Sequence, residues 1–145
     1  MIKFTIPGPP QGKGRPRFTK SGHTYTPAKT AEYEKLVQAE YIRQCAGQSL
    51  HGQPVRISID VFFEIPQNTS KKRRSEMMGM DRRPTKKPDI DNVIKIITDA
   101  LNGIAYDDDA QIVSLSATKF YDETPHVDVR LDDVRPLQAI RIIEL

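Results

Sequence analysis

Apolar residues occupy every second position between 55 and 65 of the chain, and apart from Phe62 the residues between them are polar. Because successive side chains of a β-strand point to opposite faces, this run predicts a strand with one buried face. A shorter alternation at residues 2–6 predicts a first strand, which is ended by the proline-rich segment 7–10. These two segments indicate the beginning of a β-sheet.

Apolar and polar residues alternate again at 113–117 and at 127–131, on either side of a turn-forming segment at 123–125. This arrangement predicts two strands that pair with each other as a β-hairpin. A last apolar segment at 140–145 predicts one more strand at the edge of the sheet.

A first helix is predicted between Thr26 and Gly47. Thr26 is a suitable N-cap, Pro27 suits the first helical position, and Gly47 suits the residue after the end. The residues on its expected apolar side include Ala28, Tyr33, Leu36, Val37 and Tyr41.

A second helix is predicted from Ile90 to Leu101, because apolar residues recur there at helical spacing and Gly103 follows. The polar stripe of this helix contains Asp91, Lys95, Thr98 and Asn102. Between the central strand and this helix, residues 66–88 are polar and basic and therefore predict a surface segment. Within that segment, residues 70–78 predict a short helix that ends at Gly79.

These elements predict an α+β fold, in which helices pack on one mixed β-sheet. The chain has 145 residues, which is enough to bury a self-sufficient core, so we expect a single domain over residues 1–145.

The composition changes this picture only slightly, since 22 basic and 19 acidic residues leave a net charge of +3. The distribution of charge is more informative. Residues 13–29 include five Lys or Arg and no acid, and residues 71–87 include eight Lys or Arg and two acids. Such clusters predict contacts with a polyanion such as DNA, although a solvated surface is an open alternative for the second cluster. The candidate DNA-binding residues are Lys13, Arg15, Arg17, Lys71, Lys72, Arg73, Arg74, Lys86 and Lys87.

The first basic segment also contains two aromatic residues, Phe18 and Tyr25. Stacking on exposed bases is one role for them, but for Phe18 we favour packing in the core. The segment does not match the phosphate-binding loop of NTPases. Only three residues separate Gly8 from Gly12, and Gly14 stands where Ser or Thr is required, so no nucleotide cofactor is expected.

The single cysteine, Cys45, has no internal partner for a disulfide bond. The first residues lack the apolar run of a signal peptide, and no stretch is apolar and long enough to span a bilayer. We therefore expect a cytoplasmic protein that does not contact membranes.

Asp89 and Asp91 lie at the start of the second predicted helix. Residues two apart on a helix point about 200° apart, so these carboxylates converge only if Asp89 precedes the helix, which Pro88 favours. Lys95 lies one turn beyond Asp91. Capping of the helix and an ion pair between Asp91 and Lys95 are structural alternatives for these residues.

An acidic triplet, Asp107-Asp108-Asp109, follows the second predicted helix. The helix carries the chain roughly 17 Å away, and the residues before Asp109 can span up to about 23 Å, so Asp109 can return to Asp91. If the triplet is extended, at most two of its carboxylates face one site. A plain acidic turn remains open. The crowding of carboxylates favours a counter-ion, and Mg²⁺ prefers such hard oxygen ligands.

The chain contains Lys-Pro-Asp-Ile-Asp-Asn at residues 87–92, Lys95, Asp-Asp-Ala-Gln at 108–111, and Pro10, Lys13, Arg15, Pro16 and Arg17 near its start. This combination resembles the RusA-type Holliday junction endonucleases of bacteria and their phages, and the matching motifs are distributed over most of the chain.

The resemblance implies a RusA-like fold in which Asp89, Asp91 and Asp109 are the catalytic, metal-binding carboxylates. It also implies that Lys95 is an essential helper, with Asp108 as a further candidate metal ligand. One or two Mg²⁺ ions are expected, and Mn²⁺ is expected to substitute for them.

The resemblance further implies a homodimer that nicks two opposed strands of a four-way DNA junction symmetrically, in recombination and repair. The alternative interpretation is a non-catalytic nucleic-acid-binding protein whose acids only cap a helix and form a turn.

Overall fold

The computed structural model describes residues 1–134, and the strand predicted at 140–145 lies outside this range. The helices are α1 (Ala28–Cys45), α2 (Lys71–Met78) and α3 (Ile90–Ala100), with a short 3-10 helix, η1 (Asp109–Gln111). The strands are β1 (Ile2–Pro7), β2 (Arg17–Phe18), β3 (Thr24–Tyr25), β4 (Val55–Glu64), β5 (Ile112–Asp122) and β6 (His126–Asp133). No helix within residues 1–134 is long and apolar enough to cross a membrane.

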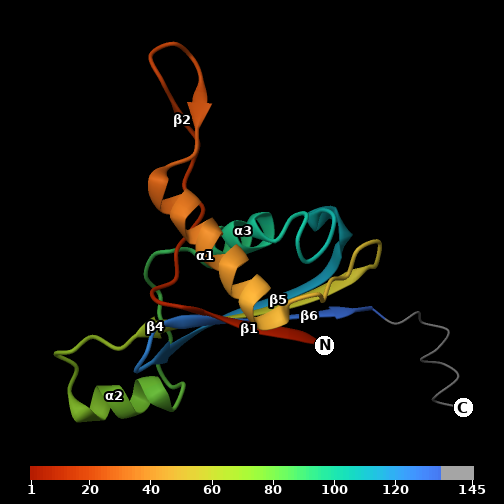
Figure 1. Ribbon diagram of the computed structural model, residues 1–145. Helices are drawn as coiled ribbons and strands as arrows, with labels where there is room; N and C mark the ends of the chain where they lie inside the picture. Colours follow the sequence, from red (N-terminus) through yellow and green to blue (C-terminus); the bar gives the residue numbers. More distant parts are fainter. Residues whose placement is uncertain (135–145) are drawn as a thin grey trace, which may run out of the picture.

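The long alternating segment forms β4, and the apolar residues at its alternate positions, from Val55 to Phe63, lie in the core, as predicted. The main sheet has the order β1-β6-β4-β5. β4 pairs antiparallel with β6 and parallel with β5, and β1 pairs antiparallel with β6. The structure is therefore the predicted α+β fold with a mixed sheet (Figure 1).

The predicted hairpin between β5 and β6 is wrong, because β4 lies between these two strands. Residues 123–125 connect them across the end of β4. This path must cover two strand spacings, about 10 Å, which three linking residues can span. Alternation identified the strands but not their neighbours, and in β5 the alternating apolar residues Val113 and Leu115 are exposed.

A long crossover, residues 65–111, connects the parallel strands β4 and β5. It contains α2, α3 and η1. α2 is the predicted short surface helix, capped by the side chain of Ser70 and ended at Gly79. α1 and α3 lie side by side over the same face of the sheet (Figure 1).

α1 was predicted correctly as a helix, but its first turn differs from the prediction. Pro27 is the N-cap and makes no capping hydrogen bond through its side chain, so Thr26 is not the cap. Ala28 is exposed, and the buried face of α1 extends instead from Thr30 to Cys45. Thr30 accepts a hydrogen bond at its hydroxyl from the Gly14 amide (3.0 Å).

α3 buries an apolar face that includes Val93, Ile96 and Ile97 against the core. Thr98 was expected on the polar stripe, but it is only 6% exposed. Its hydroxyl donates to the Ile94 carbonyl (2.9 Å), which satisfies this polar group inside the core. Thr98 therefore does not belong to the polar face of α3.

The first basic segment was expected to be a loop, but it contains the two-stranded ribbon β2–β3, which projects from the body of the protein (Figure 1). We call residues 15–25 the arm. Phe18 pairs with Thr24 across the ribbon, and its side chain is 73% exposed. The prediction that Phe18 packs in the core is therefore wrong, because the arm extends beyond any element that would cover it.

Candidate active site

One side of α3 carries a row of charged residues, Asp91, Lys95 and Asp99, which we call the acidic row. These residues are four positions apart, so each follows the last by one helical turn, a rise of about 6 Å. The Lys95 ammonium lies 3.3 Å from the Asp99 carboxylate. Asp99 was not among the predicted site residues, although its spacing of four residues from Lys95 was a usable signal.

Asp89 lies just before α3 with an extended backbone (φ −65°, ψ 145°), as predicted for convergence with Asp91. It is the N-cap residue, but its side chain does not cap the helix. Its carboxylate instead contacts the Lys87 ammonium at 2.9 Å. The Asp89 side chain is 48% exposed and thus remains open to solvent.

The segment after α3 turns back toward the helix and carries Asp109 with it. Tyr106 is buried, and its hydroxyl donates to the Thr98 carbonyl (2.6 Å), which fixes the turn against α3. The Asp109 amide then donates to the Asn102 side-chain oxygen (2.9 Å). These contacts hold Asp109 beside the last turns of α3.

Several charged side chains influence the Asp109 carboxylate. Burial, followed by the negative charges of Asp108 and Asp99, raises the pKa of Asp109 above its usual range, and the positive charge of Lys95 opposes this rise. The structure therefore brings Asp109, Asp108, Asp99 and Lys95 into one electrostatic neighbourhood. Asp91 lies one helical turn before Lys95.

The acidic triplet is not extended. Asp108 caps η1 by accepting a hydrogen bond from the Ala110 amide (3.1 Å), and the Gln111 side chain completes a capping box. Asp107 is directed elsewhere, to the His51 imidazole (2.7 Å) and the Gly52 amide (3.0 Å). Asp108 and Asp109, rather than Asp107, thus share the neighbourhood of Lys95.

Residues 1–134 contain no group of three or more His, Cys, Asp or Glu side chains placed to hold a metal ion. Mg²⁺ usually takes only one or two protein carboxylates and completes its shell with water and substrate oxygens. Asp89 and Asp91 at the start of α3, and Asp108 and Asp109 at η1, offer the hard oxygen donors that such an ion prefers. The donor chemistry therefore fits Mg²⁺.

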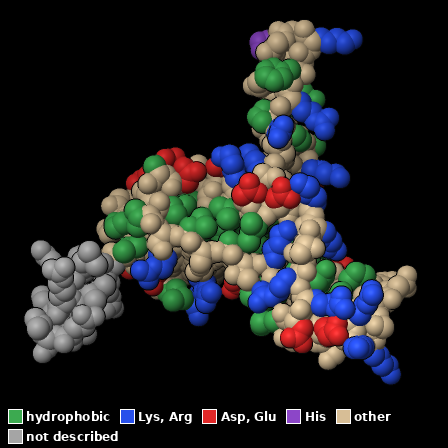
Figure 2. Space-filling view, turned by 180° about the vertical axis from the view of Figure 1, so that it is seen from behind, with side chains coloured by type: hydrophobic (Ala, Val, Ile, Leu, Met, Phe, Trp, Pro, Cys, Tyr) green, Lys and Arg blue, Asp and Glu red, His purple; other side chains and the backbone are tan. Residues whose placement is uncertain are grey.

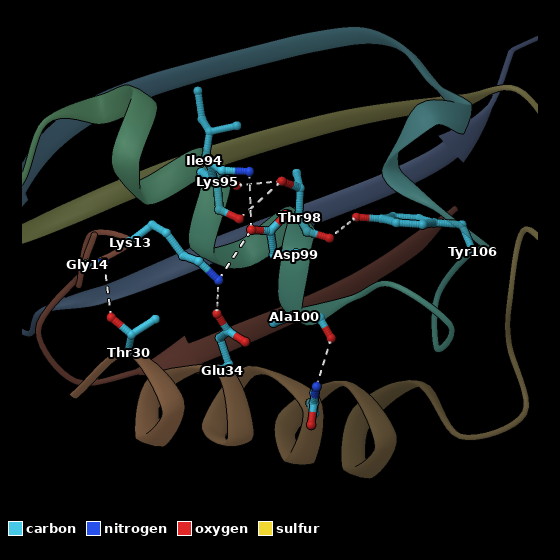
Figure 3. Close-up of polar contacts among 11 residues, drawn as sticks. Lys13, Gly14, Thr30, Glu34, Ile94, Lys95, Thr98, Asp99, Ala100 and Tyr106 are labelled. Carbon is cyan, nitrogen blue, oxygen red and sulfur yellow. Dashed lines mark hydrogen bonds and ion pairs between the residues drawn. The ribbon is translucent and has the colours of Figure 1, made fainter. Parts of the chain in front are cut away.

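Lys13 differs from the other candidate DNA-binding residues. Its side chain is 23% exposed and lies between α1 and α3, where the ammonium pairs with Glu34 and with Asp99 (3.3 Å) (Figure 3). Burial alone would lower the pKa of Lys13, but the hydrogen bonds and charges of Glu34 and Asp99 outweigh it and raise the pKa. Lys13 therefore stays charged and is largely covered by carboxylates.

The other candidate cations lie mainly on the surface. Arg15 and Arg17 are exposed on the arm. Lys71 to Arg73 are exposed on α2, and Lys86 and Lys87 are exposed before α3. Arg74 differs, because it is half-buried and pairs with Glu123 (2.8 Å). Figure 2 shows acidic side chains at the base of the arm, with Lys and Arg side chains along the arm and on the lobe formed by α2. On that face, acidic side chains thus lie between the cations of the arm and those of the α2 lobe.

A family model described as "Endodeoxyribonuclease RusA" matches residues 7–132 of the chain. The chain is 38% identical over 139 residues to the "Uncharacterized protein YqaN" of Bacillus subtilis (strain 168), an alignment covering 92% of this chain and 96% of that protein. It is also similar to "Crossover junction endodeoxyribonuclease rusA" of Lactococcus phage r1t, with 33% identity over 82 residues and 56% of each chain covered. The matched residues include the whole acidic row on α3 and the return to Asp109.

Proposed function

Because this chain belongs to the RusA endodeoxyribonuclease family, we propose that it resolves four-way DNA junctions by paired, symmetric, Mg²⁺-dependent nicks in DNA recombination and repair. The observation that carries this proposal is the match of the family model to residues 7–132, a range that includes Asp91 and Lys95 on one side of α3 and the return of the chain to Asp109, whose amide bonds to Asn102. Carboxylates beside an ammonium, with exposed cations around them, suit the hydrolysis of a polyanion.

Asp89, Asp91, Asp108 and Asp109 are the residues that would hold one or two Mg²⁺ ions, with Mn²⁺ as a substitute. A bound divalent ion supplies Lewis acidity, which eases the deprotonation of water and neutralises phosphate charge. In the overall reaction water attacks phosphorus, one phosphorus–oxygen bond breaks, and the leaving sugar oxygen takes up a proton.

Lys95 contributes a positive charge at the reacting phosphate. Its side chain is 62% exposed, so a DNA strand can approach the ammonium directly. An ammonium fixed near the phosphate stabilises the negative charge that develops on the non-bridging oxygens in the transition state. Lys95 therefore has its role in the chemical step.

The exposed cations of the arm, of α2 and of the segment before α3 are proposed to contact the DNA backbone, where each contact releases counter-ions.

Two opposed strands of a junction are most simply cut by a twofold dimer, because each subunit then presents one site to one strand. A DNA substrate is consistent with the predicted cytoplasmic location.

A non-catalytic DNA-binding protein is the second candidate. It is favoured by the structural roles that several acids already have, namely the capping box of Asp108 and the ion pair between Asp89 and Lys87. Under this interpretation the acidic residues only stabilise the fold, and the basic residues alone contact DNA.

Incubating the protein with a synthetic four-way junction and Mg²⁺ distinguishes the two candidates. The proposed nuclease is expected to give symmetric nicks in two opposed strands, which are visible on a denaturing gel and lost when EDTA is added. Slower migration of an uncut junction on a native gel would identify a binding protein. Equal cutting of linear duplex would identify a nuclease without selectivity for branches.

The arm is the proposed element for recognising the branch point. Its ribbon carries exposed Phe18 on one face and half-exposed Tyr25 with Arg17 on the other. Stacking of an unpaired base on an aromatic ring contributes about 1–3 kcal/mol. Base stacking is interrupted at a branch point, where the faces of bases can become accessible to an aromatic ring, whereas linear duplex is stacked throughout.

Phe18→Ala is accordingly expected to weaken junction binding by about 10-fold and to leave duplex binding nearly unchanged. Fluorescence anisotropy with labelled junction and labelled duplex measures the two affinities and hence their ratio. Ile42→Ala is the matched control, because Ile42 is a large apolar residue that is 57% exposed on α1, away from the arm. Equal losses for junction and duplex would show that Phe18 does not read the branch.

A further inference from the structure

Asp99 lies between two lysines that come from distant parts of the chain (Figure 3). Its Oδ2 is 3.3 Å from Lys95 Nζ on its own helix and 3.3 Å from Lys13 Nζ on the segment before the arm. The Asp99 side chain is only 20% exposed. A carboxylate so covered is held by its partners rather than by water.

Lys13 is fixed both at its side-chain ammonium and at its backbone. The Lys13 ammonium also pairs with Glu34 of α1, and the Lys13 amide donates to the Asn92 carbonyl (2.9 Å). Beside it, Gly12 lies against Pro88 and Asn92 so closely that an added Cβ would come within 3.1 Å of both. Lys13 therefore has a defined position relative to α3.

These contacts form one chain of alternating charges, Glu34, Lys13, Asp99 and Lys95. The four formal charges sum to zero, so each buried charge has a counter-charge next to it. Only the last member, Lys95, is largely exposed. The chain thus ends in a single ammonium that faces the proposed substrate.

An exposed lysine has many rotamers of similar energy, and fixing one of them costs side-chain entropy. A partner that restrains the ammonium before substrate binds reduces this cost in the chemical step. Asp99 is placed to do this, because Lys95 is its i−4 neighbour and Lys13 prevents the carboxylate from rotating away.

The geometry points to Asp99 as a positioning residue that restrains the Lys95 ammonium, with Lys13 and Glu34 holding Asp99 in turn. This inference rests on the proposed function, since Lys95 acts only if the protein cuts DNA. It gives Lys13 a role inside the protein rather than on the DNA surface.

Asp99→Asn is expected to lower the cleavage rate of saturating junction by about 10- to 100-fold, which is typical when a partner that orients an active-site group is lost. Junction affinity and the Mg²⁺ concentration for half-maximal rate should stay within about twofold of the parent values. Asp99→Glu keeps the charge and should restore part of the rate. Asp60→Asn is the matched control, because Asp60 also makes a 3.3 Å ion pair, with Arg130 on β6.

A double-mutant cycle tests whether Asp99 acts through Lys95. In a Lys95→Ala background, Asp99→Asn should cause no further loss of rate. A full additional loss would overturn the positioning role, and so would a raised Mg²⁺ requirement, which would make Asp99 a metal ligand. If the parent protein cuts junctions and the Asp99→Asn variant is equally active, this inference alone is overturned. If the parent protein is inactive, the proposed function is overturned.

Discussion

Asp91→Asn is expected to lower the rate of junction cleavage by about 1,000-fold or more. Asn has nearly the same shape as Asp but lacks the charge that holds a divalent ion, and a loss of about 4 kcal/mol in transition-state stabilisation corresponds to this factor. Asp91 is exposed in the first turn of α3, so the substitution should leave folding intact. Single-turnover cleavage with excess protein measures the effect.

Binding to the junction should persist in Asp91→Asn, because removing a negative charge near a phosphate backbone does not weaken attraction to DNA. Asp107→Asn is the control from the acidic triplet. Its carboxylate turns toward His51 and Gly52, away from Lys95, so cleavage should stay close to the parent rate. Parental cleavage by Asp91→Asn would remove this carboxylate from the chemistry.

Lys95→Ala is expected to lower the rate at saturating junction by about 100- to 1,000-fold, the usual cost of removing one donor that stabilises transition-state charge. Affinity for the junction should change by only a few-fold, since one cation among many is lost. Lys95→Arg keeps the charge with a different shape and should retain part of the rate.

Lys35→Ala provides the comparison for Lys95→Ala, because Lys35 is also exposed and lies on the neighbouring helix α1. The same charge is removed, but no carboxylate of the acidic row is affected. If both variants lose the same small factor, Lys95 contributes only to the general attraction of DNA and not to the chemical step.

The sequence predicted those features that depend on local periodicity. The alternation in β4 and the helical spacing in α3 each identified an element and its buried face, because burial repeats with the period of the backbone. The extended conformation of Asp89 was also predicted, since two carboxylates two residues apart can converge only when one of them lies outside the helix.

The features that depend on tertiary neighbours were not predicted. Local alternation contains no information on which strand lies beside which, so β4 between β5 and β6 could not be foreseen. Lys13 belongs to a basic segment, yet its ammonium is covered because Glu34 and Asp99 meet it from two helices. The ribbon of the arm was missed because its strands are only two residues long.

The crossover between β4 and β5 also affects how the protein folds. Parallel strands cannot be joined by a tight turn, so residues 65–111 must close a long loop before β5 can pair with β4. Asp91 and Lys95 lie inside this loop, and Asp109 lies directly before β5. The residues of the proposed site are therefore brought together by a non-local pairing step, the closure of the loop between β4 and β5.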